Sequence, residues 1–308
     1  MQYRKHNSRR LAQLGCVCCA LSLLAFSGCA TLHRNQVSED VIAARRMSLQ
    51  GADAMQQGKL KEAEVWFADA VQTNPADERA HTQYAELLWQ SGQHDPAITH
   101  MEKSVELSGG DATLQVRLGE MYLGRGDVGL AMQQAEQAIQ SNRDLACAWA
   151  LRADVHRQRG ALPEALADYH RSLWQDGFCP HVQLALAAIY REQQRPRRAL
   201  STLEALAENY APDKQPFQLR FEQGLAMKAL GRYADAADLF ALVAAREDAT
   251  ADVFFQLAEV RMLGGDPVNA RLALASALER EPQHVASLQL REQINVEQQS
   301  LTTAVGRF

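Results

Sequence analysis

The sequence predicts an all-α solenoid, in which helix–turn–helix pairs stack along one continuous core. Three observations predict this fold. Alanines recur every 34 residues, a small residue lies 12 positions before each of them, and a glycine lies five positions before nearly every one. A fixed period of this length is typical of repeat proteins, whose units bury their apolar faces only against their neighbours. The composition agrees, because 47% hydrophobic residues in a chain of 308 are too many for a disordered protein.

Residues 1–28 predict a secretory signal peptide. The first 15 positions carry basic residues and no acid, and an apolar run follows from residue 16 to residue 26. A charged start, a short apolar segment and small residues before a cleavage point describe such a signal. The apolar run is well short of the roughly 20 residues that span a bilayer. We therefore expect this segment to be removed.

Residues 26–29, Phe-Ser-Gly-Cys, resemble the bacterial lipobox, although Phe26 replaces the usual leucine. The resemblance implies cleavage before Cys29 and acylation of its thiol with palmitate-type chains. Ala30, in place of aspartate, implies sorting to the outer membrane. The alternative is an ordinary secretory signal with a chance cysteine.

Cys147 and Cys179 are the cysteines that remain after Cys29, and their spacing fits no metal-binding motif. We expect two small buried residues. A disulfide in an oxidising periplasm is the alternative.

The repeating alanines set the register of seven repeats. An apolar residue lies four positions after nearly every alanine, where it would fill the space between neighbouring repeats. The glycine between the two helices supplies the turn, since only glycine takes a positive φ without steric cost. It is present in six of seven repeats, and Gln194 replaces it in the fifth. The alanines are Ala63, Ala97, Ala131, Ala165, Ala199, Ala236 and Ala270.

This pattern resembles the tetratricopeptide repeat (TPR). The resemblance implies a right-handed superhelix of helix–turn–helix pairs. We expect residues 29–43 to form the lipidated tether and the start of the first helix, 285–299 a capping helix and 300–308 a tail. The predicted repeats are 44–77, 78–111, 112–145, 146–179, 180–213, 217–250 and 251–284.

In the TPR family the first helices of the pairs line a concave groove, through the second, fifth, ninth and twelfth places of each repeat. Large aromatic residues at these places are candidates for anchoring a peptide or a partner helix. The alternatives are that the rings pack between adjacent first helices and that the charges form local ion pairs. Carried over to this sequence, the places give the aromatic residues Trp89, Phe221 and Phe255, and the charged residues Glu86, Glu120, Asp154, Arg157, Arg191, Lys228 and Glu259.

Several activities are not expected. The fifth places hold no basic residue, which argues against the TPR clamp for a chaperone's C-terminal carboxylate. Motifs for a zinc protease, a serine-hydrolase elbow or a phosphate-binding loop are missing. With 32 Lys+Arg against 37 Asp+Glu, the chain lacks the basic footprint of a nucleic-acid binder. We expect no catalytic site, metal, cofactor or small-molecule substrate.

The sequence thus predicts a non-enzymatic protein-binding scaffold, held by Cys29 in a bacterial outer membrane and facing the periplasm. Anchoring would raise the effective concentration of the groove at the membrane. The arrangement resembles repeat-built lipoproteins that assist pilus or secretin assembly or dock envelope hydrolases and proteases. Two alternatives remain: a structural envelope protein that self-associates, and an accessory subunit of an envelope biogenesis, secretion or pilus complex.

Overall fold

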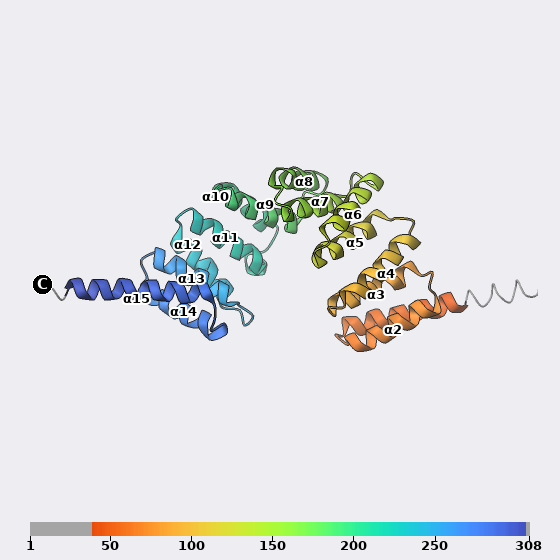
Figure 1. Ribbon diagram of the computed structural model, residues 1–308, viewed down its shortest axis with the longest axis horizontal. Helices are drawn as coiled ribbons and strands as arrows, with labels where there is room; N and C mark the ends of the chain where they lie inside the picture. The colour runs from red at the N-terminus through yellow and green to blue at the C-terminus, as the bar shows by residue number, and fades with distance from the viewer. Residues whose placement is uncertain (1–38, 306–308) are drawn as a thin grey trace, which may run out of the picture. The chain divides into compact units, whose positions relative to one another are not determined.

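The computed structural model describes the backbone of residues 39–305 and the side chains of residues 39–296. The predicted signal peptide and Cys29 lie outside the described residues. From residue 39 to 305 every regular element is a helix, which confirms the predicted all-α class (Figure 1). None of these helices combines the length and the apolar character that a membrane crossing needs.

The chain divides into two compact bodies, one ending at Gln158 and one beginning at Arg159. The first body holds a helix over residues 39–56, followed by α2 (Leu60–Thr73), α3 (Glu78–Gln90), α4 (His94–Leu107), α5 (Ala112–Arg125), α6 (Val128–Ser141) and α7 (Ala146–Gln158). The second body holds α8 (Leu162–Gln175), α9 (Pro180–Glu192), α10 (Pro196–Ala207), a 3-10 turn (Pro212–Lys214), α11 (Phe217–Ala229), α12 (Tyr233–Ala244), α13 (Ala251–Leu263), α14 (Pro267–Arg280) and α15 (Val285–Val305).

Within each body the helices pack in sequential pairs. In Figure 1, α3 lies beside α4 and α13 beside α14, and each pair also contacts the helix that follows or precedes it. The seven repeat alanines are buried, with exposed fractions of 0–1%. The residues four positions after them are buried as well, from Phe67 in the first body to Leu274 in the second. Each body therefore has the buried core that the 34-residue period predicts.

The small residues near the start of each repeat have a steric reason. A Cβ atom on Gly51 would lie 2.8 Å from the buried ring of Phe67, and one on Gly224 would lie 2.8 Å from that of Phe240. Real Cβ atoms do not approach this closely. Glycine therefore lets the ring of the second helix rest directly on the backbone of the first.

The turns inside the repeats use the left-handed region of φ. Gly126 ends α5 with φ 94°, and Gln194 takes the equivalent position in the fifth repeat with φ 58°. For a residue with a Cβ atom, this region of φ costs roughly 1–2 kcal/mol of conformational free energy. Gln194 tolerates the cost because its N–H donates to the Arg191 carbonyl and the next N–H to that of Tyr190, which closes the end of α9.

The C-terminal helix differs from the prediction. We expected it to end at residue 299, but α15 continues to Val305, because no glycine or proline interrupts the sequence before Gly306. Ser287 and Ile294 are buried, and Leu290 packs on the core of α12–α14. The helix therefore covers the end of the second body.

The expectation of two buried cysteines is wrong. Cys147 is exposed and Cys179 is partly exposed, and both are thiols. On α7 the buried positions are Ala148, Ala150, Leu151, Ala153 and Val155. Cys147 is the second residue of α7, so it lies at the N-terminal end of the helix, and its side chain is exposed there.

Candidate partner-binding surface

The predicted groove residues lie on the first helices of the pairs: α3, α5 and α7 in the first body, and α9, α11 and α13 in the second. We call the side of these helices that carries the second, fifth, ninth and twelfth places of the repeats the first-helix face. Each body presents its own first-helix face.

On the first body, Arg117 of α5 holds two of the predicted acids. Its guanidinium Nε lies 2.5 Å from Glu86 Oε1 of α3 and its Nη2 2.6 Å from Oε2, which is a bidentate pair. Its Nη1 lies 2.8 Å from Glu120 Oε2. The hydrogen bonds with Glu86 raise the pKa of Arg117 above its ordinary value, against the opposing effect of burial. One cation thus links two neighbouring first helices.

On the second body, the cations at the twelfth places make the same kind of link. Arg191 Nη2 of α9 lies 3.6 Å from Glu222 Oε2 of α11. Lys228 of α11 pairs with Glu259 of α13 and donates to Gln256 Oε1 at 2.9 Å. Burial raises the pKa of Glu222, and the nearby Arg191 offsets only part of that rise.

Arg157 differs from the other charged candidates. Its guanidinium lies 3.9 Å from Asp154 on its own helix, α7. Its side chain is about half exposed, and it offers more surface to solvent than Arg117 does.

Sequence reasoning missed Arg117 and Glu222, which occupy the sixth place of their repeats. The spacing of opposite charges along the sequence could have identified them. Each of the three pairs between first helices, Glu86–Arg117, Arg191–Glu222 and Lys228–Glu259, joins opposite charges 31 residues apart, which is one repeat less about one helical turn.

The aromatic candidates are half-buried and in contact with the core. The Trp89 ring lies 4.3 Å from that of His94, and it covers Gly124, where a Cβ atom would lie 2.8 Å from Trp89 Cζ2. Phe221 packs edge-on against Phe240, with ring centroids 5.5 Å apart. Each ring therefore supports the packing of helices and leaves only part of its surface for a partner.

Phe255 is the third aromatic candidate, and its ring centroid lies 5.8 Å from that of His284. It also packs on the core cluster of α12–α14. By contrast, Trp174, at the end of the second helix α8, is 86% exposed. Sequence reasoning did not single out Trp174, because it lies outside the places that the TPR resemblance assigns to the groove.

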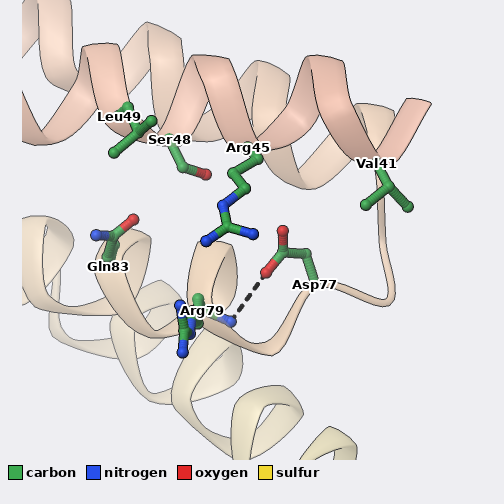
Figure 2. Close-up of a pocket in the computed structure, with 7 residues that line it drawn as sticks. All are labelled: Val41, Arg45, Ser48, Leu49, Asp77, Arg79 and Gln83. Carbon is green, nitrogen blue, oxygen red and sulfur yellow. Dashed lines mark hydrogen bonds between the residues drawn. The ribbon is translucent and has the colours of Figure 1, made fainter. Parts of the chain in front are cut away.

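A cavity of about 420 Å³ opens at the N-terminal end of the first body's first-helix face (Figure 2). The helix over residues 39–56 contributes one wall, and the start of α3 contributes the other. Arg45 and Arg79 stand at the second places of the first two repeats, and Ser48 at a fifth place. The lining residues are Val41, Arg45, Ser48, Leu49, Asp77, Arg79 and Gln83.

Metal-binding chemistry was not expected from the sequence. Across the part of the chain that the structure describes, no three side chains among His, Cys, Asp and Glu gather in a way that would hold a metal ion.

Comparison with known proteins places these features in context. Residues 54–106 and 184–252 match two family models, each described as a tetratricopeptide repeat. These repeats build protein-binding scaffolds that are typically not enzymes. No curated protein sequence matches the chain.

Solved structures show the same fold. A tetratricopeptide repeat protein from Parabacteroides merdae is similar with a TM-score of 0.61 at 14% identity, over 82% of this chain and 98% of that one. PilW, described as a widely conserved type IV pilus biogenesis factor, has a TM-score of 0.59 at 18% identity, over 70% and 97%. Pseudomonas aeruginosa PilF has a TM-score of 0.51 at 13% identity, over 83% and 99%. The fold is therefore that of a TPR solenoid.

Proposed function

We propose that this TPR solenoid is a non-enzymatic scaffold that recruits or assembles partner proteins through its first-helix faces. The observation that carries the proposal is the match of both bodies to TPR models, together with the helix pairs within each body. A stack of such pairs presents an extended surface suited to a peptide or a helix of another protein.

The aromatic residues Trp89, Phe221 and Phe255 are the proposed anchors. A half-buried ring loses little conformational freedom on binding, because its neighbours already hold it in place, and aromatic residues are enriched at binding hot spots. The charged residues Glu86, Glu120 and Arg191 would act differently. They already have ionic partners within their own body, so they would select partners by complementary potential and add little binding energy.

Arg157 is the proposed exception among the charged residues. Its guanidinium lies 3.9 Å from the Asp154 carboxylate on the same helix, and about half of its side chain is accessible to a partner. It would therefore pair with a carboxylate of the partner more readily than Arg191 would.

We further propose that the scaffold works in the bacterial envelope, anchored through Cys29 in the outer membrane. The lipobox-like residues 26–29 support this location. The likeness in fold to PilW, a pilus biogenesis factor, is consistent with a role in assembling an envelope structure. The anchor would hold the first-helix faces at the membrane surface, where clients of such an assembly pass.

Capture of a client from solubilised membranes tests the proposal. We expect wild-type protein to retain a client that Trp89→Ala, Phe221→Ala and Phe255→Ala retain at least fivefold less, because each change removes an anchor. Quantitative mass spectrometry of the bound fraction gives the ratio. Trp174→Ala is the matched control, since it removes an exposed tryptophan outside the first-helix face and should leave capture unchanged.

Each variant must first show the wild-type circular dichroism spectrum, because the three anchors also pack on the core. Equal capture by all five proteins would contradict the assignment of the surface.

A further inference from the structure

The cavity at the N-terminal end of the first body carries an excess of positive charge. Its walls hold two guanidinium groups, Arg45 and Arg79, and one carboxylate, Asp77. Oδ1 of Asp77 accepts hydrogen bonds from the backbone N–H groups of Arg79 and Ala80, at 3.1 and 3.2 Å, and so caps α3. Neither arginine forms an ion pair within the part of the chain that is described. The cavity therefore favours an anion.

The cavity also contains a polar group that lacks a partner. Ser48 is 8% exposed, and its Oγ has no hydrogen-bond partner among the described residues. Figure 2 shows this hydroxyl between the two walls, on the side of Arg45. A buried hydroxyl without a partner is costly and rare in folded proteins. An acceptor bound beside Arg45 would satisfy it.

Aliphatic side chains lie on both sides of Arg45. Val41 precedes it by four residues and Leu49 follows by four, so all three share one face of the helix. Val41 is 42% exposed and Leu49 66%, which is high for side chains beside a cavity. Figure 2 shows Arg45 between them, pointing toward Asp77 and Arg79.

The spacing of these side chains indicates the shape of the ligand. Eight helical residues at about 1.5 Å each separate Val41 from Leu49 by about 12 Å. In an extended chain, residues two before and two after a central residue point to the same side and lie about 13 Å apart. A carboxylate at the centre of such a segment would reach the arginines while its aliphatic neighbours cover Val41 and Leu49.

We propose that this cavity binds an extended protein segment of the form aliphatic-x-acidic-x-aliphatic, with the side-chain carboxylate of Asp or Glu between Arg45 and Arg79 and hydrogen-bonded to Ser48 Oγ. The carboxylate belongs to an internal residue, because aliphatic contacts lie on both sides of it. A volume of about 420 Å³ lies within the range of ligand pockets and accommodates the acidic side chain. This inference rests on the proposed scaffold function and names the chemistry of its partner.

A blocked, fluorescein-labelled peptide, acetyl-Leu-Ser-Glu-Ser-Leu-amide, tests the proposal by fluorescence anisotropy with the full chain. We expect the peptide to bind about tenfold more tightly than its glutamine analogue, and binding to weaken as salt is raised. Arg45→Gln and Arg79→Gln should each weaken it about tenfold. Arg46→Gln is the matched control, because Arg46 is exposed and does not line the cavity.

Ser48→Ala separates binding from folding. It removes a buried hydroxyl that has no partner in the unbound protein, so it should leave the midpoint of urea unfolding unchanged or raised, while peptide affinity falls severalfold. Equal affinity for the glutamate and glutamine peptides, no binding up to millimolar peptide, or an equal loss with Arg46→Gln would each overturn the proposal.

Two further results distinguish the cavity from the scaffold as a whole. In the first, the double variant Arg45→Gln/Arg79→Gln captures the same amount of client from membranes as wild type does, whereas Trp89→Ala captures less. The scaffold then stands and the carboxylate site is wrong. Binding of phosphatidylglycerol vesicles that depends on Arg45, without peptide binding, would assign the cavity to a lipid surface and also overturn the proposal.

Discussion

His81 and His100 face each other between α3 and α4 of the first body, in a contact that the repeat pattern does not predict. Their Nδ1 atoms lie 3.0 Å apart, and His81 Nε2 lies 3.2 Å from the carbonyl oxygen of Pro75. A carbonyl only accepts, so the proton of neutral His81 is on Nε2, and its Nδ1 accepts from His100 Nδ1–H. In this arrangement both rings are neutral, and the two Nδ1 atoms and His81 Nε2 all have hydrogen-bond partners.

This pair predicts a loss of stability in acid. Burial lowers the pKa of both histidines, and the charge of His81 adds to the effect on His100. For His81, Lys103 lowers the pKa further, while the carbonyl of Pro75 and the carboxylate of Asp77 partly offset the shift. Below the unfolded-state value of about 6.5 the unfolded chain takes up protons that the folded chain does not. Stability is therefore full above that pH and falls as the pH drops through it.

Urea unfolding at pH 7.5 and pH 5.5 measures this loss. We expect the free energy of unfolding to fall between the two in wild type and to fall less in His81→Gln/His100→Gln, since glutamine does not titrate. The comparison uses the difference between pH values, so a general destabilisation by the variant does not affect it. The same loss in both proteins would show that other groups cause it.

At the scale of the elements, the distance between paired helices depends on the small residue near the start of each repeat. Gly51 meets Phe67 and Gly224 meets Phe240 within one repeat, and Gly119 meets Leu151 of the next repeat, all with too little room for a Cβ atom. The ring of Phe240 also supports Phe221, one of the proposed anchors. The backbone contact at Gly224 therefore positions part of the first-helix face.

Gly224→Ala should lower the free energy of unfolding by about 1–3 kcal/mol, because the new methyl group would displace a fully buried ring. Gly129→Ala is the matched control. Gly129 lies in α6 with no atom within 4 Å of the added Cβ, so the higher helix propensity of alanine should add up to about 1 kcal/mol. Urea unfolding measures both, and a neutral or stabilising Gly224→Ala would contradict the steric argument.

At the scale of the whole molecule, the chain has a core that extends from pair to pair in each body, and its last pair needs a cover. Helix α15 provides it, with Ile294 2% exposed and Leu290 packed on Leu274 and its neighbours. Terminal repeats of solenoids generally need such a cap with a polar outer side for solubility. On α15 that side carries Gln289, Glu292 and Gln293.

Ending the chain after His284 should lower the free energy of unfolding by about 3 kcal/mol, since it exposes apolar surface that an isoleucine and a leucine now cover. Static light scattering should then show association that increases with protein concentration. A chain that ends after Val296 retains the described contacts of α15 and serves as the control. The full chain should stay monomeric; association of the full chain at micromolar concentration would favour the self-associating structural protein over the scaffold.

Much of the fold can be predicted from the sequence, because the residues that define each repeat contact residues close to them in the chain. The alanines, the small residues and the turn glycines act within one helix pair or between neighbouring pairs, so their spacing alone predicts buried positions and turns. Cys147 shows the limit of this reasoning. Cysteine is often buried, but whether a position is covered depends on what packs against that part of its helix, and Cys147, at the N-terminal end of α7, is exposed.

The sequence by itself determined the helix pairs, their register and the places where large side chains must rest on glycine or alanine, because these follow from a 34-residue period within each repeat. Only the tertiary structure decided which charges meet across repeats and which polar groups remain without a partner. Arg117 reaches Glu86 only because two first helices lie side by side, and Ser48 shares a cavity with Arg45 and Arg79 for the same reason. Such contacts depend on distances between side chains of different helices, which a one-dimensional pattern does not contain.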